Sequence, residues 1–436
     1  MKKFFAPILC SAIFIGCGGP PSAPAQNVTM PSSSNEEVKL DSPAPKIKVY
    51  VENSGSMDGY VRDVTDFENA VYSYLSDIQL ADLGKKIEPM SAKNTLELNY
   101  INSRVLRQTP DLNAFIKALE PNDFKMKGGN RGTSDMSDIL NSILKETNSE
   151  NEVAIFVSDC IFSPGNQYMA NDNADQYILA QQIGIKTHFV EKMTQFPQFS
   201  IIIFQLTSQF NGIYYNKFDQ RTTINATRPY YIWLMGNRSN LKRMLCEVDV
   251  DKIKGSGVQN IYMASKPIKS LSYGILPQQS IGKFKPDPTN SKTSVIDARP
   301  IKTSGNSSFQ LAIGVDFSQM LIPDEYLMNP NNYSVSNNAY RLEIVKNKNS
   351  QSSYTHIVKL NLTEPIISKG AIKITLNNSM PAWVEEYTDE VGLDINAEGA
   401  MEKTYGLKYL IGGVYDAYAS NKEQENNHGV ITVNIR

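Results

Sequence analysis

The chain is poor in cysteine and histidine, and it has no surplus of positive charge. Its 436 residues include four cysteines, too few for a disulfide scaffold, and three histidines, too scattered for an HExxH zinc-hydrolase motif. A formal net charge of −2 argues against nucleic acid as the main partner, because phosphate binding requires a basic field. With 41% hydrophobic and 20% charged residues, the composition is typical of a globular protein.

Long apolar runs are also missing, apart from one short run at the N-terminus. Lys2 and Lys3 precede the apolar stretch 4–15, which has signal-peptide length and falls short of the ~20 residues of a transmembrane helix. The stretch ends in Gly16-Cys17, which resembles a bacterial lipobox. Residues 1–17 are therefore predicted to be a lipoprotein signal peptide, with Cys17 as the lipidated residue. A plain secretory signal remains the alternative.

Residues 18–45 are rich in proline and serine and show no apolar periodicity, so they are predicted to form a disordered tether. As a flexible coil, these residues would span roughly 30 Å. We therefore expect an exported lipoprotein of the bacterial cell envelope, anchored in a membrane (in our expectation the outer one) through its N-terminal lipid. Cys160 and Cys246 remain in the processed chain, and both are expected to be buried apolar residues.

Chain length favours two domains, because single cores usually stop growing near ~250–300 residues. Residues 46–250 alternate apolar runs with amphipathic segments, which predicts an α/β fold with a doubly wound, mostly parallel sheet. The expected strands are 47–51, 153–157, 199–206 and 230–235, and the expected helices are 67–78, 112–119, 136–144 and 175–182.

Residues 251–436 have a different texture, with polar loops between short alternating segments, and predict a β-rich, sandwich-like second domain. The expected strands are 309–315, 340–345, 356–362, 372–376 and 431–435, with one helix at 407–418. Trp383 and its acidic neighbours suggest either a core anchor beside a solvated loop, which we favour, or a binding surface.

Five oxygen-bearing side chains are predicted to converge at one edge of the α/β sheet. Glu52, Ser54 and Ser56 follow the first strand, Thr133 precedes the helix at 136–144, and Asp159 follows the strand at 153–157. Ligands of open α/β sheets bind beyond the carboxyl ends of the strands. Hydroxyl and carboxylate oxygens suit magnesium, manganese or calcium, so the sequence predicts a divalent-cation site.

This segment resembles a von Willebrand factor type A (VWFA) domain with its metal-ion-dependent adhesion site (MIDAS). The family pattern is Asp-x-Ser-x-Ser after the first strand, a distant Thr, and an Asp that ends a central strand. Ser54, Ser56, Thr133 and Asp159 match these positions, and the resemblance covers about residues 46–246. Residues 251–436 resemble no family that we can name.

The resemblance implies roles for the four matching residues. Ser54 and Ser56 would bind the ion directly, Thr133 directly or through water, and Asp159 mainly through water. An open coordination position would then accept a carboxylate from a partner protein. Such a site binds by sharing a metal and has no catalytic machinery of its own.

Glu52 departs from the family pattern, since it stands where the family has its first Asp. The carboxylate lies one methylene further out, and magnesium tolerates poor octahedral geometry badly. Three possibilities stay open: Glu52 ligates through a water, the site prefers calcium or manganese, or the site is vestigial. Asp58 and Asp135 are near enough in sequence to contribute charge, and Arg131 is expected to be a solvated surface residue.

These features predict a lipid-anchored protein that binds a protein, or alternatively a glycan, through the MIDAS-like site. A metal-independent structural or assembly component with a degenerate MIDAS is the alternative. An enzyme is not expected, because the sequence has no Gly-x-Ser-x-Gly elbow, P-loop or zinc motif. The segment around Ser54 also has no histidine nearby, and His188, the nearest along the chain, is assigned to a strand or loop at 186–190.

Overall fold

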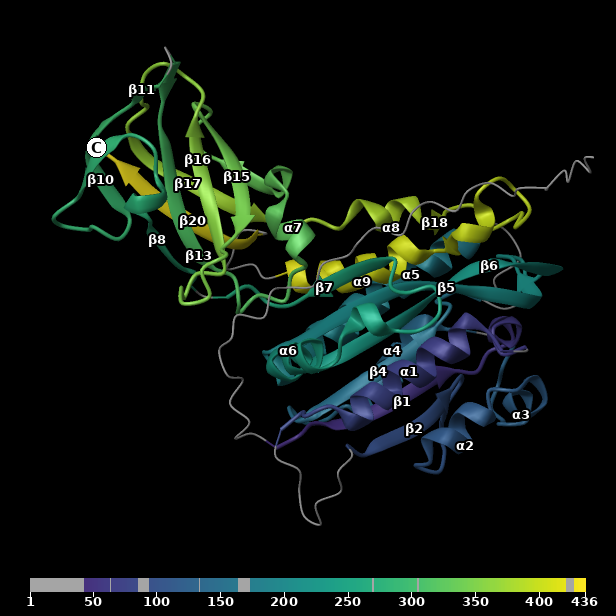
Figure 1. Cartoon of the computed structure of the whole chain (residues 1–436). Coiled ribbons are helices and arrows are strands. Elements are labelled where there is room, and N and C mark those ends of the chain that lie inside the picture. The colour runs from purple at the N-terminus through teal and green to yellow at the C-terminus, as the bar shows by residue number, and fades with distance from the viewer. Residues whose placement is uncertain are drawn as a thin grey trace, which may run out of the picture.

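The computed structural model describes residues 43–62, 64–84, 94–132, 134–163, 173–268, 270–303, 306–420 and 427–436. These residues form an α/β body around a seven-stranded sheet and a separate β-rich unit beside it (Figure 1). Cys17 and the rest of the predicted signal peptide lie outside the described residues, as does the tether up to residue 42. Within the described ranges, no helix has the length and apolarity needed to cross a membrane.

The central sheet has the strand order β3-β2-β1-β4-β6-β5-β7. Strand β1 pairs in parallel with both β2 and β4, whereas every other pairing in the sheet is antiparallel. The strands are β1 (Lys46–Glu52), β2 (Leu96–Ile101), β3 (Val105–Arg107), β4 (Glu152–Ser158), β5 (Phe199–Tyr215), β6 (Arg221–Asn237) and β7 (Asn260–Ala264).

Helices cover both faces of this sheet and enclose a hydrophobic core on each side. The helices α1 (Asp66–Leu80), α2 (Leu112–Lys117), α3 (Pro121–Lys125) and α6 (Arg238–Glu247) contribute to one core. The helices α4 (Met136–Glu146) and α5 (Asn173–Gln195) contribute to the other. Burial on both faces explains why β4 contains a continuous apolar run.

The prediction of an α/β fold is confirmed, but the mostly parallel sheet was wrong. The order β3-β2-β1-β4 matches the order of strands 3, 2, 1 and 4 in a doubly wound sheet, but β3 pairs antiparallel with β2. Beyond β4 the chain makes a hairpin in place of helical crossovers, since β5 and β6 pair antiparallel along their whole length from Phe199/Asn237 to Tyr215/Arg221. The apolar runs located both strands but not their length, because polar residues outnumber apolar ones in the distal halves of the hairpin.

The β-rich unit consists mainly of two sheets with a shared hydrophobic core. The five-stranded sheet has the order β14-β17-β20-β10-β9, and the four-stranded sheet has the order β15-β16-β13-β8. The strands are β8 (Ser272–Ile275), β9 (Lys283–Pro286), β10 (Ser294–Arg299), β13 (Gln310–Asp316), β14 (Tyr333–Val335), β15 (Tyr340–Lys346), β16 (His356–Leu362), β17 (Gly370–Asn377) and β20 (Asn427–Ile435). The short hairpin β11 (Ile301–Thr303) and β12 (Asn306–Ser308) and the helix α7 (Asp324–Met328) complete the unit.

The packing does not follow the predicted boundary between residues 250 and 251. Strand β7 is the edge strand of the α/β sheet, and the chain returns to this sheet after β17. The returning segment comprises α8 (Ala382–Glu386), β18 (Thr388–Asp389), β19 (Thr404–Tyr405) and α9 (Leu407–Ala419). Its helix α9 packs against α5 and completes the second core, as Figure 1 shows. Strand β20 then rejoins the β-rich unit.

The two cysteines of the processed chain, His188 and Trp383 have environments that partly differ from those predicted. Cys160 is buried, but Cys246 in α6 is exposed, so its predicted burial was wrong. His188 lies within α5 and not in a strand or loop. Trp383 packs against the second core and its indole nitrogen donates to the carbonyl of Ile261 at 3.3 Å, which agrees with its reading as an anchor.

Candidate functional site

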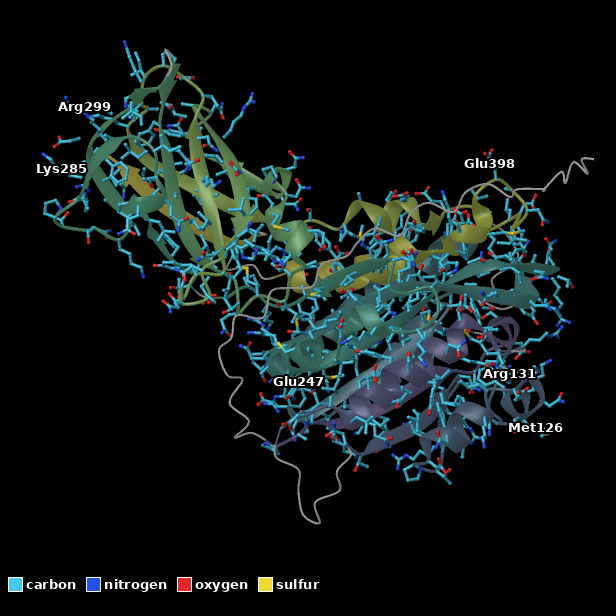
Figure 2. All side chains as sticks on the ribbon, in the orientation of Figure 1. Met126, Arg131, Glu247, Lys285, Arg299 and Glu398 are labelled. Atoms are coloured by element: carbon cyan, nitrogen blue, oxygen red, sulfur yellow. The ribbon has the colours of Figure 1, made fainter. Side chains whose placement is uncertain are left out.

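The candidate site lies where β1 and β4 end side by side. Glu52 is the last residue of β1, and Asp159 directly follows the last residue of β4. Because the two strands are parallel neighbours, both carboxylates are brought to the same edge of the sheet. Both side chains are fully buried, with 0% exposure. This end of the α/β body, where Arg131 and Met126 are found, points away from the β-rich unit (Figure 2).

Glu52 is surrounded by serine hydroxyls. Its Oε1 accepts a hydrogen bond from Ser134 at 2.8 Å, and its Oε2 accepts one from Ser158. Ser54 supplies a further hydrogen bond. Burial raises the pKa of Glu52, and the hydrogen bonds from Ser158, Ser54 and Ser134 oppose that rise. The serine hydroxyls thus compensate part of the free-energy cost of burying the Glu52 carboxylate.

Asp159 is less completely satisfied than Glu52. The backbone N–H of Ile161 donates to its Oδ1 at 3.2 Å, and the hydroxyl of Ser56 favours the ionised form of the carboxylate and so lowers its pKa. Its Oδ2 is buried and has no hydrogen-bond partner among the described residues. Burial, followed by the charge of Glu52, raises the pKa of Asp159 to about 7. Buried carboxylate oxygens in folded proteins almost always have a hydrogen-bond partner, so the unpartnered Oδ2 is unusual.

Ser54 and Ser56 link the two carboxylates. Their hydroxyl oxygens lie 2.9 Å apart, and Ser56 opens the short 3-10 helix η1 (Ser56–Gly59). Gly55 between them has ordinary helical dihedral angles, so it is not required for an unusual turn. The structure therefore brings together Glu52, Ser54, Ser56 and Asp159. Thr133, the fifth predicted residue, lies outside the described residues.

Arg131 fastens the loop that carries the two serines, which corrects its assignment as a solvated residue. Its guanidinium donates to the side chain of Asn53 and, at 3.0 Å, to the carbonyl of Ser54, and it forms an ion pair with Asp58. Asp58 is also 3.6 Å from the ammonium group of Lys125. The charge of Asp58 is therefore neutralised within the loop and is not directed at Glu52 or Asp159.

Asp135 likewise serves a structural purpose. Its Oδ1 accepts the N–H of Asp138 at 2.9 Å and caps α4, and its Oδ2 accepts from Gln181 at 2.8 Å. Asp58 and Asp135, the two nearby acids expected from the sequence to contribute charge, thus form ion pairs or hydrogen bonds with other residues.

A buried guanidinium, that of Arg228, acts electrostatically on Asp159. Arg228 of β6 is 1% exposed and packs over the ring of Tyr214 at 4.9 Å. Its Nη1 donates to the carbonyls of Ala400 at 3.2 Å and Met401 at 3.0 Å, while its Nη2 has no partner among the described residues. The positive charge of Arg228 partly offsets the rise in the pKa of Asp159. The returning segment near residue 400 thus holds a permanent cation close to the site.

The distal half of the β5–β6 hairpin packs against the serine loop. A side chain at Gly59 would collide with the ring of Phe210, whose nearest atom would lie 2.4 Å from the added carbon. The hydroxyl of Tyr60 donates to the carbonyl of Pro229 at 2.6 Å. On the opposite side of the loop, the N–H of Gly55 donates to the carbonyl of Arg131 at 2.9 Å. Ser56 nevertheless remains partly exposed, so the site reaches the surface there.

The residues present fit a small hard cation. Two carboxylates, one of them with its Oδ2 unpartnered, and two serine hydroxyls form an oxygen-only donor set, and a cation would relieve the mutual repulsion of Glu52 and Asp159. No cluster of three or more His, Cys, Asp or Glu side chains suited to a metal occurs among the described residues. The proposed donor set contains only two residues of these four types, Glu52 and Asp159, because its other donors are serine hydroxyls. The absence of a cluster of three from the described ranges is therefore compatible with this donor set.

Three contributors to the site were not singled out from the sequence. Ser134 and Ser158 hold Glu52, and both stand next to predicted residues, so adjacency to Thr133 and Asp159 was the available signal. Arg228 gave no local signal. It reaches the site only because β6 pairs with β4 in antiparallel register, with Tyr231 opposite Ser158.

Comparisons with known proteins give no family for this chain. No family model matches it, and no curated protein matches it. One solved structure with weak similarity is described as "Crystal structure of the human COPII-coat protein Sec24c", with 5% sequence identity and a TM-score of 0.16. That alignment covers 74% of this chain and 45% of the other, and its low score carries no argument.

Proposed function

We propose that this chain is a lipid-anchored cell-envelope protein that binds a partner protein through a MIDAS-like divalent-cation site in a VWFA-like α/β body. In this proposal the two-sheet unit is a β-sandwich that positions the body. The single observation that carries the proposal is the pairing of two buried carboxylates, Glu52 and Asp159, with Asp159 Oδ2 unpartnered. Serine hydroxyls from the loop after β1 lie between them.

Four described residues would hold the ion: Glu52, Ser54, Ser56 and Asp159. The bound cation would supply a positive charge that a carboxylate of the partner can share. Arg131 would keep the serine loop in place by its bonds to Asn53 and Ser54, and Ser134 and Ser158 would orient Glu52. Exposure at Ser56 offers the route by which a partner could approach.

Calorimetric titration with magnesium, manganese and calcium tests the proposal. We expect saturable binding of at least one ion by the wild type and a loss of at least tenfold in affinity for Asp159→Ala and for Ser54→Ala. Glu150→Gln is the control, because Glu150 is an exposed acid that precedes β4, at the opposite end of this strand from Asp159. Absence of binding by all three ions, or equal binding by Asp159→Ala, would disprove the metal site.

The lipid anchor requires its own test. Labelling of expressing bacteria with a radioactive fatty acid should mark the wild-type chain and leave Cys17→Ala unmarked. Equal labelling of both chains would contradict the assignment of Cys17.

A second candidate function, a metal-independent structural component, is favoured by one observation. Glu52 is already satisfied by hydroxyls, and the guanidinium of Arg228 already provides a cation near Asp159. Under this alternative, Arg228→Met would destabilise the protein equally with and without divalent cation. Under the metal proposal, the added ion would offset most of that loss, because it replaces the missing charge.

A further inference from the structure

Positive charge is concentrated in the β-rich unit. Residues 265–381 and 427–436 together contain fourteen Lys and Arg but only seven Asp and Glu, whereas the whole chain has 43 and 45. Four of those seven acids already form ion pairs, namely Asp287, Asp297, Asp324 and Glu343. The unit therefore presents an excess of cations in a protein whose overall charge is slightly negative.

Four of these cations lie on the five-stranded sheet or next to it, three of them on the edge strand β9 and its neighbour β10, and three of the four act on the carboxylate of Asp297. Lys283 of β9 is the direct cross-strand neighbour of Arg299 of β10, and Lys285 lies two residues further along β9. Lys369 stands immediately before β17. All four side chains are exposed, and we call them the basic face.

A single exposed acid, Asp297, is embedded in the basic face. It accepts a hydrogen bond from Lys285 at 2.9 Å. That hydrogen bond, and then the charges of Lys285, Arg299 and Lys369, lower the pKa of Asp297, which places these cations around one carboxylate. Like charges directly opposite each other, such as Lys283 and Arg299, are unfavourable in a sheet unless an anion lies nearby.

Two exposed aliphatic side chains belong to the segments that carry the basic face. Ile281, two residues before Lys283, is 41% exposed, and Ile366, three residues before Lys369, is 77% exposed. Cations beside exposed aliphatic groups are the combination by which peripheral proteins bind anionic lipid surfaces.

The basic face and the start of the folded chain lie toward the same end of the molecule. Arg243 of α6 donates to the carbonyl of Pro43 at 3.4 Å, so the chain enters the fold beside α6. Figure 2 shows Glu247 of α6 on the side of the body nearer the β-rich unit, with Lys285 and Arg299 beyond it, whereas Arg131 at the candidate site lies at the far end. A tether that enters at Pro43 would thus keep the basic face near its anchoring membrane.

We propose that the basic face docks on an anionic membrane surface and orients the candidate site away from that membrane. The proposal rests on the membrane anchoring in the proposed function, but it does not depend on metal binding. Lysines on an edge strand also protect it from pairing with other chains, and β9 is an edge strand. The experiment must therefore separate these two roles of Lys283 and Lys285.

The test uses the chain from residue 18 onward, without lipid and in the presence of chelator, in a vesicle co-sedimentation assay. We expect binding to vesicles of phosphatidylcholine with 30% phosphatidylglycerol, little binding to pure phosphatidylcholine, and loss of binding in 0.5 M salt. The variant Lys283→Gln/Lys285→Gln/Arg299→Gln should bind at least tenfold more weakly, since each cation near the surface contributes. The control Lys117→Gln/Lys145→Gln removes exposed lysines of α2 and α4 and should bind like the wild type.

Three results would overturn the proposal: equal binding to neutral and anionic vesicles, unchanged binding by the triple variant, or binding of DNA and heparin without binding of vesicles. Self-association of the triple variant with unchanged vesicle binding would assign the lysines to edge protection alone. Because chelator is present throughout, a failure here is independent of any failure of the metal site.

Discussion

At the scale of single residues, the candidate site contains two buried carboxylates, those of Glu52 and Asp159. Each is fully buried, and each raises the free energy of the folded state when it is ionised without a compensating cation. Serine hydroxyls lower that cost for Glu52 more completely than for Asp159, whose Oδ2 is unpartnered. Asp159 is therefore the residue at which pH and metal should act most strongly.

The raised pKa of Asp159 predicts a particular pH dependence of stability. Because its pKa rises from 3.8 unfolded to about 7 folded, the folded state binds the proton more tightly, and the contribution of this group to stability falls as pH rises from about 4 to about 7. Urea unfolding in chelator at pH 5 and pH 7.5 should show this loss in the wild type and a smaller loss in Asp159→Asn. An identical pH slope in the two proteins would contradict the assignment. Saturating divalent cation should reduce the slope, since the ion binds the ionised carboxylate.

The sequence predicts that Glu52 and Asp159 lie at neighbouring strand ends, but it does not predict their environment. Apolar runs followed by Glu52 and Asp159 place both carboxylates at strand ends, and parallel pairing then brings them together. Nothing local in the sequence distinguishes Arg131, which fastens the serine loop, from an exposed arginine. Its role follows only from long-range packing of the loop before α4 against the loop after β1.

At the scale of elements, the long β5–β6 hairpin is what departs most from a doubly wound sheet. Its proximal half completes the sheet, and its distal half packs on η1 beside the site. The contact is close because Gly59 and Gly212 allow the two backbones to approach: a side chain carbon on Gly212 would lie 2.7 Å from the Cα of Gly59. The hairpin thus supports the loop that carries Ser54 and Ser56.

Gly59→Ala tests this support. The added methyl group meets the ring of Phe210, so we expect a loss of stability of roughly 1–3 kcal/mol, as overpacking typically produces, together with weaker cation binding. Gly132→Ala is the control, because the nearest atom to its added carbon is the side-chain oxygen of Asn130 at 3.4 Å, an ordinary contact. Denaturant unfolding measures the first effect and calorimetry the second. Equal behaviour of the two variants would show that the hairpin does not constrain the loop.

Elements were predictable where one pattern persisted over many residues. The helix α4 and the strands β15, β16 and β17 agree closely with their expected ranges. The strands β2 and β7 were not expected, because short strands with polar residues such as Asn99 and Asn260 give no clear periodicity. Their places in the sheet are decided by pairing with distant segments.

At the scale of the whole molecule, the α/β body is built from both ends of the sequence. The helix α9 lies more than 200 residues after α5, yet it packs against α5 and covers the sheet. The domain boundary predicted at residue 250 from composition could not reveal the packing of α9 on α5. Local composition indicates the type of secondary structure, but it does not indicate the distant segment against which an element packs. Figure 1 shows the returning segment lying along the body while the β-rich unit projects from it.

A pair of neighbouring glycines in α9 provides a matched test of this arrangement. A methyl group on Gly413 would lie 2.7 Å from the carbonyl oxygen of Gln182, whereas one on Gly412 would meet only the side-chain amide of Gln182 at 3.2 Å. Both changes gain about 1 kcal/mol of helix propensity. We therefore expect Gly413→Ala to lower the unfolding midpoint and Gly412→Ala to leave it unchanged or raise it.

Tryptophan fluorescence is a suitable readout for these two variants, because Trp233 and Trp383, the only tryptophans of the chain, both pack in the second core of the body. A fluorescence transition unaffected by Gly413→Ala would mean that α9 does not contribute to the stability of the body.

The late position of α9 has a consequence for how the protein is made. During synthesis or export, the first 400 residues emerge with one face of the central sheet still lacking its last covering helix. Aromatic and aliphatic side chains of that face, including Tyr231, Trp233 and Tyr262, stay accessible to other chains until the C-terminal segment arrives. Packing of this face is thus completed only after α9 has been made, which leaves an incompletely covered sheet open to misassociation until then.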